Sequence, residues 1–352
     1  MKTRRTPRWP VAAAALAGAV PRSRLHPAVV AWAQSRPARE GWAVALSGGA
    51  DSVALLLLLW AHWPARRERL VALHFDHRLR GRASAADARF CGRLCAGLGV
   101  NFVPGRWDAR RKDPGAAGAR AARFDFFARR MGPRRLRVLW LGHQQDDVAE
   151  SLLMRLARGS GAGGLSAPRP VHAFPSGRSG VQPSYHVRPL LTLRKAELAA
   201  ALRSAGGAWR EDASNVQDVH FRNRVRRRVL PAWARAAGRD AVAGAARSRE
   251  LLEEDDEALE AWADELGAIS AERALDLRAL AARPRALVRR VLHRWLRAQS
   301  IPSRLSRQGF EALLGAVIAA APTRHSLGNH GFAAIRRGKL VFESSRKPRT
   351  AH

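Results

Sequence analysis

The chain has 352 residues, of which 47% are hydrophobic, so it is long enough to bury the cores of about two domains. Its 62 Lys and Arg residues outnumber 29 Asp and Glu residues, which gives a formal net charge of +33 at pH 7. This excess favours a polyanionic partner such as nucleic acid, because basic groups that neutralise phosphates release counterions. An Arg-rich composition without functional consequence is the alternative. The two cysteines, Cys91 and Cys95, exclude a disulfide framework, and the lack of an apolar run of about 18 residues argues against a transmembrane helix or a membrane partner.

Residues 1–38 begin with basic side chains and continue into a weakly apolar, Ala-rich run at 11–20. A secretory signal peptide requires a more apolar segment at this place. We therefore predict that residues 1–38 form a poorly ordered extension and that the protein is cytoplasmic.

Between residues 39 and 228, short apolar runs alternate with segments of helical periodicity. We expect strands at 42–46, 70–75, 100–103 and 137–142, and helices at 52–60, 84–98, 116–130 and 146–158. An irregular connection at 165–190 that returns to the sheet near 187–191, and a helix at 193–204, should follow. Strands and helices that alternate at this spacing form right-handed β-α-β units, so we predict an α/β domain with a parallel sheet.

Two further regions are expected after residue 228. Residues 229–320 are rich in Ala, Leu, Glu and Arg with helical periodicity, which predicts a separate, smaller α-helical domain. Residues 321–352 should form a short C-terminal segment. Its apolar runs at 332–335 and 339–342 flank Arg337 and Gly338, which predicts a hairpin.

A polar, glycine-rich turn separates the first expected strand from a helix that is apolar on nearly all sides; it reads Ser47-Gly48-Gly49-Ala50-Asp51-Ser52. Two glycines let the backbone approach an anion, and the amino end of a helix attracts it. A bare phosphate would repel Asp51, so we expect this carboxylate to hold a Mg2+ ion that bridges to phosphate. A tight turn that merely needs glycine would not require so many polar groups.

A second polar cluster follows the fourth expected strand and contains His143, Asp146, Asp147 and Glu150. Ligands bind at the carboxyl ends of strands in open α/β sheets, so this cluster should face the same crevice as the turn at 47–52. Asp147 and Glu150 are three residues apart and therefore share one helix face. Two alternatives stay open: acidic residues that only stabilise a helix start, and a His that is only hydrogen-bonded.

The turn at 47–52 resembles the Ser-Gly-Gly-x-Asp-Ser motif of the PP-loop ATP pyrophosphatase superfamily, whose members cleave ATP between the α and β phosphates. Longer blocks resemble the tRNA(Ile)-lysidine synthase family; in chain order they are 76–81, 143–150, 158–165, 188–191, 209–215 and 222–226. In that family ATP adenylates C2 of the wobble cytidine of a tRNA(Ile) with a CAU anticodon. The ε-amine of L-lysine then displaces AMP, and lysidine forms.

The resemblance implies a ligase that forms a carbon–nitrogen bond, with ATP and Mg2+ as cofactors and tRNA(Ile) and L-lysine as partners. It implies that residues 39–228 form a PP-loop nucleotide-binding domain in which the turn at 47–52 binds ATP, and that the helical domain at 229–320 recognises the tRNA substrate. Residues expected to act in catalysis or lysine binding are Asp147, Glu150, Asp146, His143 and Arg120. Residues expected to bind tRNA are Arg222, Arg224 and Arg226. For these three arginines, a solvated basic helix face is the alternative.

The sequence departs from the family in a few places, such as Ala116, where an acidic residue is usual, and Phe124, where Tyr is common. Another PP-loop tRNA-modifying enzyme, such as a thiolase, is one alternative, although Cys91 and Cys95 lack the C-x2-C spacing of that class. A noncatalytic RNA-binding module is the other. The carboxylates near the expected phosphate site argue against it, because a pure phosphate binder gains nothing from them. A homodimer is compatible with the sequence.

Overall fold

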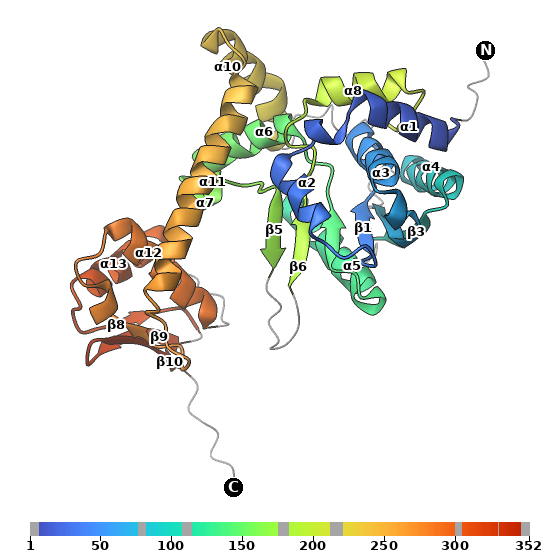
Figure 1. Cartoon of the computed structure of the whole chain (residues 1–352). Coiled ribbons are helices and arrows are strands. Elements are labelled where there is room, and N and C mark those ends of the chain that lie inside the picture. Colours follow the sequence, from blue (N-terminus) through green and yellow to red (C-terminus); the bar gives the residue numbers. More distant parts are fainter. Residues whose placement is uncertain are drawn as a thin grey trace. The chain divides into compact units, whose positions relative to one another are not determined.

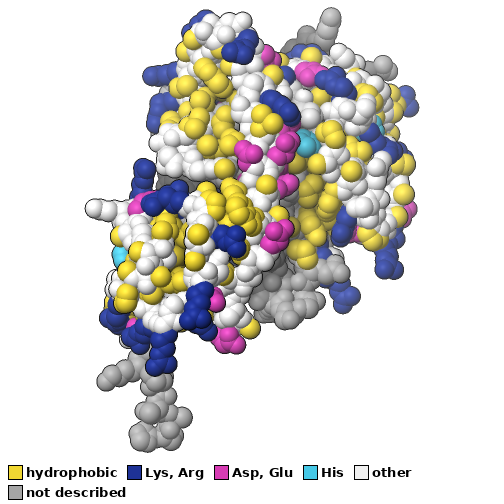
Figure 2. Space-filling model, turned by 60° about the vertical axis from the view of Figure 1, so that its left-hand side comes forward, with side chains coloured by type: hydrophobic (Ala, Val, Ile, Leu, Met, Phe, Trp, Pro, Cys, Tyr) yellow, Lys and Arg dark blue, Asp and Glu magenta, His cyan; other side chains and the backbone are white. Residues whose placement is uncertain are grey.

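The structure is a computed structural model of the chain, and it describes residues 7–76, 82–107, 115–174, 183–211, 221–299, 305–329 and 331–345. The chain divides into two compact units, Met1–Glu253 and Glu254–His352 (Figure 1). None of the described helices combines the length and the apolar character that a membrane span needs. Lys and Arg side chains are spread over the face shown in Figure 2 rather than gathered in one patch.

The first unit is built on a six-stranded sheet with the strand order β3-β2-β1-β4-β6-β5. Its strands are β1 (Trp42–Ala45), β2 (Leu70–Asp76), β3 (Asn101–Arg106), β4 (Val138–Trp140), β5 (Val171–Phe174) and β6 (Ser184–Val187). All neighbouring strands are parallel except β5, which is antiparallel to β6. The predicted α/β class is confirmed. The expected irregular connection is wrong where β5 and β6 pair, because the sheet edge beside β4 supplies hydrogen-bond partners.

The first unit contains helices as well as its sheet. They are α1 (Trp9–Ala19), α2 (Pro27–Gln34), α3 (Ala50–His62), α4 (Arg82–Leu98), α5 (Gly115–Met131), α6 (Gln145–Leu156), α7 (Ala162–Leu165), α8 (Lys195–Ser204), α9 (Phe221–Arg224) and α10 (Leu230–Ala237), with a π-helical turn η5 (Val225–Val229). Alternate residues of β1 face two cores. Trp42 and Val44 pack in the core that contains α3, and Ala43 packs in the core that contains Phe126 of α5.

The N-terminal segment is an integral part of the first unit. Trp9 and Leu16 of α1 are buried in the same core as α3, so the prediction of a poorly ordered extension is wrong for residues 7–38. Trp9 packs edge-on against Phe90, with ring centroids 6.0 Å apart. A Cβ atom on Gly97 would lie 2.6 Å from its indole, so the indole fits only because α4 carries glycine at this position.

The second unit combines helices with a four-stranded antiparallel sheet of order β7-β10-β9-β8. The strands are β7 (Leu275–Asp276), β8 (Thr323–Ser326), β9 (Gly331–Arg336) and β10 (Lys339–Ser344), and the helices include α12 (Arg285–Ala298) and α13 (Arg307–Ile318). Helix α11 (Ala241–Glu265) runs through the boundary between the units. The β9–β10 hairpin matches the expected one, with positive φ at Arg337 and Gly338. β7 and β8 extend it into a sheet that the helical periodicity did not predict.

Candidate active site

The ends of three strands bring the candidate residues to one edge of the sheet. β1 pairs with β4 and β4 pairs with β6, all in parallel. The turn at 47–52, called the phosphate loop below, follows β1, while His143 follows β4 and Arg188 follows β6. The carboxyl ends of these strands form the edge at which open α/β sheets bind their ligands.

Hydrogen bonds to one side chain hold the phosphate loop in its turned conformation. The Oγ of Ser52 accepts from the backbone N–H groups of Ser47 and Gly48, each at 3.2 Å. The same hydroxyl donates to the carbonyl of Gly49 at 2.9 Å. Gly48 has a φ of +93°, and a Cβ there would lie 3.2 Å from the Sγ of Cys91, so this position requires glycine. The loop leads directly into the amino end of α3, which favours an anion.

Asp51, in the first turn of α3, has a buried carboxylate oxygen, Oδ1, without a hydrogen-bond partner among the described residues. Burial, reinforced by the carboxylate of Asp147, raises the pKa of Asp51 from 3.8 to about 6. The described part of the chain contains no group of three acidic, His or Cys side chains that could hold a metal ion by itself. The unpartnered oxygen fits a Mg2+ ion that takes most of its other ligands from phosphate and water.

Gln144 determines where α6 begins and how its acidic residues point. Its side chain accepts from the backbone N–H of Asp146, and its own backbone N–H donates to Oδ2 of Asp147 at 3.0 Å, which completes a capping box. Helix capping therefore accounts for one oxygen of Asp147. It leaves Oδ1 of Asp147 and both oxygens of Glu150 for other partners.

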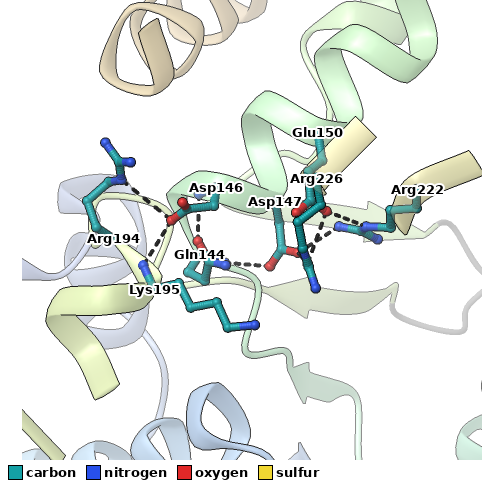
Figure 3. A network of polar contacts seen from close by, with 8 residues as sticks. All are labelled: Gln144, Asp146, Asp147, Glu150, Arg194, Lys195, Arg222 and Arg226. Atoms are coloured by element: carbon teal, nitrogen blue, oxygen red, sulfur yellow. Dashed lines mark hydrogen bonds and ion pairs between the residues drawn. The ribbon is translucent and has the colours of Figure 1, made fainter. Parts of the chain in front are cut away.

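These remaining oxygens bind two guanidinium groups (Figure 3). Arg222 donates through a terminal nitrogen to Oδ1 of Asp147 and through Nε to Oε2 of Glu150, both at 2.6 Å. Arg226 donates to both oxygens of Glu150 and lies 3.6 Å from Oδ1 of Asp147. We call these four residues the Arg–carboxylate network. It holds two positive and two negative charges, and the side chain of Glu150 has 0% exposure.

The Arg–carboxylate network joins residues for which the sequence predicted different ligands, namely lysine for the carboxylates and tRNA for the arginines. The side chains of Arg222 and Arg226 are 37% and 27% exposed to solvent, whereas that of Asp147 is 12% exposed. A group that approaches from solvent therefore meets guanidinium nitrogens first. Arg224 is placed differently, with its guanidinium 5.8 Å from the ring centre of Phe221.

Asp146 points away from the Arg–carboxylate network and ties α6 to α8 (Figure 3). Its Oδ2 accepts from the backbone N–H of Lys195 at 2.9 Å and lies 3.5 Å from Nε of Arg194. These contacts assign a structural role to Asp146, although the sequence grouped it with the catalytic candidates.

His143 lies among arginines. Its Nδ1 accepts from Nε of Arg188 at 3.3 Å. Burial lowers the pKa of His143 well below 6.5, and the positive charges of Arg188, Arg222 and Arg120 lower this pKa further. His143 is therefore neutral at physiological pH and can accept or donate a hydrogen bond, but it adds no charge to the site.

Arg210 contacts the phosphate loop and was missed by the sequence reasoning. Its backbone N–H donates to the carbonyl of Gly48 at 2.9 Å, and its Nε donates to Oδ1 of Asp87 at 2.8 Å. The signal that could have found it is its place between two residues of the block at 209–215. Residues 77–81 and 212–215 of the family-like blocks lie outside the described residues.

Two family models match the chain. The PP-loop domain matches residues 26–233, which is more than half of the chain, and the TilS substrate binding domain matches residues 275–341, from β7 to β10.

Curated relatives agree with these matches. The chain is 40% identical over 224 residues to the tRNA(Ile)-lysidine synthase of Geobacter sulfurreducens, which is 61% of this chain and 44% of that protein. It is 37% identical over 237 residues to that of Solibacter usitatus (65% and 48%) and 39% identical over 223 residues to that of Symbiobacterium thermophilum (61% and 44%). The chain spans about half the length of these relatives.

Proposed function

We propose, since this chain belongs to the PP-loop family, that it uses ATP to attach L-lysine to C2 of the wobble cytidine in a tRNA(Ile) with a CAU anticodon. The observation that carries the proposal is the parallel pairing of β1 and β4, which brings the phosphate loop and the Arg–carboxylate network to one edge of the sheet. The carboxylate of Asp147 also helps to raise the pKa of Asp51, in agreement with this arrangement. A phosphate loop beside guanidinium groups and carboxylates suits two anionic substrates and one cationic amine. The three relatives named above are all called tRNA(Ile)-lysidine synthase, which supports lysine as the amine.

In the first step, the O2 atom of the cytidine attacks the α-phosphorus of ATP and pyrophosphate leaves. The phosphate loop and the amino end of α3 would bind the pyrophosphate end of the nucleotide. Asp51 would hold a Mg2+ ion, which neutralises negative charge on the phosphates when it is bound. The hydrogen bonds of Ser52 keep the loop in this conformation before the nucleotide arrives.

In the second step, the ε-amine of lysine attacks C2 and AMP leaves. Asp147 is the carboxylate that the incoming ammonium can reach, because Glu150 is fully enclosed beneath the two arginines. Lysine would therefore exchange with a guanidinium group at Asp147, which then accepts hydrogen bonds from the amine. Glu150 would act as a positioning residue that anchors Arg222 and Arg226.

The exposed atoms of Arg222 and Arg226, together with Arg224, would bind the tRNA. The cytoplasm is the proposed location, because tRNA and ATP are available there. A thiolase-like reaction is disfavoured. Both cysteines are buried, burial raises the pKa of Cys95 to about 12, and a buried thiol of this kind is inert toward metal or sulfur chemistry at neutral pH.

The first test is the incorporation of labelled lysine into total RNA by the purified chain with Mg2+ and ATP. We expect acid-stable label in one isoleucine tRNA, and no label with the Asp51→Asn variant. RNA-dependent release of pyrophosphate without lysine incorporation would keep the PP-loop chemistry and overturn lysine as the substrate. Tight RNA binding without either reaction would support the RNA-binding module instead.

A further inference from the structure

Three arginines lie together at the ligand-binding edge, and none of them pairs with an acidic side chain among the described residues. Arg120 and Arg123 are three residues apart on α5 and share one aromatic ring, with their guanidinium carbons 4.8 and 5.6 Å from the ring centre of Phe124. The Phe124 ring contacts His186 of β6 at a centroid distance of 5.1 Å. This contact brings the face of α5 beside Arg188, which follows β6 by one residue.

No carboxylate in the described part of the chain balances the charge of this group. Arg188 is 7% exposed, and its hydrogen bonds go to His143 and to the carbonyl of Arg169. Nε of Arg123 is buried and has no hydrogen-bond partner among the described residues. None of Arg120, Arg123 and Arg188 forms an ion pair with a described carboxylate.

Arg188 is buried and Arg123 is half-buried, and cationic groups in such places without a described counter-charge are costly unless an anion binds to them. Burial and the charge of Arg120 lower the pKa of Arg123 to about 10, and similar causes act on Arg188. The histidines in this region add no charge at neutral pH, since burial and Arg188 lower the pKa of His186 to about 3. The positive charge therefore comes from guanidinium groups alone, which suit the geometry of a phosphate.

We propose that Arg120, Arg123 and Arg188 form a phosphate-binding site that takes a backbone phosphate of the RNA substrate. The site lies apart from the phosphate loop: β6 is two strands away from β1, which is about 10 Å at the usual strand spacing. A phosphate bound at the loop therefore leaves this second site open for another anion. The inference rests on the proposed function for its choice of RNA, and ATP is the competing source of the phosphate.

The test compares the binding of an RNA hairpin with a CAU anticodon at several salt concentrations. The variants are Arg123→Gln and Arg188→Gln in the full chain, with Arg120→Gln as a third variant whose more exposed side chain makes misfolding less of a concern. Arg129→Gln is the matched control, because it removes the same charge from the same helix at a side chain that is 68% exposed and paired with Asp125.

We expect each of the three variants to weaken hairpin binding about tenfold and to reduce the slope of log K against log salt by about 0.7 to 0.9 for one lost phosphate contact. The control should change neither value to that extent, and the KM for ATP should stay the same in all variants. An unchanged slope, an equal effect of Arg129→Gln, or a raised KM for ATP with normal RNA binding would each overturn the proposal.

Lysine incorporation is measured separately and distinguishes this proposal from the proposed function. A wild-type chain that shows the Arg-dependent salt slope but incorporates no lysine would overturn the function and leave the phosphate site intact. If the chain incorporates lysine but none of the three variants changes the salt slope of RNA binding, the phosphate site is overturned and the proposed function stands.

Discussion

Arg222 donates through Nε to the buried carboxylate of Glu150 at 2.6 Å and thereby joins α9 to α6 across 72 positions of the chain. This contact places a candidate tRNA-binding residue and a candidate lysine-binding residue in a single charge-balanced network. Since the guanidinium groups cover the carboxylates, lysine can reach a carboxylate only by displacing a guanidinium group. The binding of lysine and the binding of tRNA are therefore expected to affect each other. The roles of the two carboxylates can then be separated by their exposure.

Asp147→Asn should raise the KM for lysine about tenfold and leave the KM for ATP nearly unchanged. The side chain of Asp147 keeps 12% exposure, so an ammonium group can reach it, and the amide removes one charge-assisted hydrogen bond. Steady-state kinetics with each substrate varied in turn measures the two values. Equal increases for both substrates would contradict a lysine-specific role and indicate a function in nucleotide binding.

Glu150→Gln should lower the free energy of unfolding by about 3 kcal/mol, because it leaves two partly buried guanidinium groups with one compensating charge fewer. Urea unfolding of the first unit, followed by intrinsic fluorescence, measures this loss. Adding Arg226→Gln to the variant should restore part of the stability, since it removes the uncompensated charge. A double variant that is less stable by the sum of the two single effects would contradict the pairing.

The stability of the chain should depend on pH through Asp51. Its pKa is raised from 3.8 to about 6, so the folded state binds a proton more tightly than the unfolded state does. Stability from this group is therefore present below pH 4 and is lost as the pH rises through about 6, by up to about 3 kcal/mol. Asp51→Asn should remove this loss, so that the variant is more stable than the wild type at pH 8 and similar near pH 4. Urea midpoints across this pH range, without nucleotide or Mg2+, provide the measurement; identical pH profiles would contradict it.

The parts of the fold that depend on local sequence were predictable. Buried strands can be predicted from their apolar runs. The phosphate loop is a contiguous motif, and its Gly48 is required by a positive φ. The Arg–carboxylate network was not predictable, because the residues that form it are far apart in sequence and their pairing depends on how α9 packs against α6. Neither the motif at 222–226 nor the motif at 143–150 indicates from its own sequence that it pairs with the other.

Two other features were missed for different physical reasons. The Ala-rich α1 carries no strong apolar signal, and its place in the core depends on the fit of Trp9 against Gly97. β7 has two residues, which pair with β10 and through Leu275 with Ile269, so its sequence is too short to show a strand periodicity. Both elements are determined by partners elsewhere in the chain.

Trp9→Ala should destabilise the first unit by about 3 to 5 kcal/mol, because it removes a buried indole that is 5% exposed. Val11→Ala on the same helix is the control, since that side chain is 58% exposed and should cost less than about 0.5 kcal/mol. Thermal or urea unfolding of both variants gives the comparison. Equal stability of the two variants would mean that α1 contributes little to the core.

Asp256→Ala should destabilise the second unit far more than Asp264→Ala does, although both residues lie on α11 and pair with arginines of α12. Asp256 binds Arg290 with side-chain exposures of 4% and 14%. Its removal leaves this largely buried charge with Glu260, which is 39% exposed, as its remaining partner, at a cost of about 3 kcal/mol. Asp264 pairs with Arg294 at 2.6 Å but is 70% exposed, where an ion pair contributes only about 0 to 1 kcal/mol. Urea unfolding measured with a tryptophan of the second unit, Trp295, separates the two cases. Because the distances alone would predict similar effects, a large difference between the variants would show that burial determines the strength of these pairs, and equal losses would contradict this.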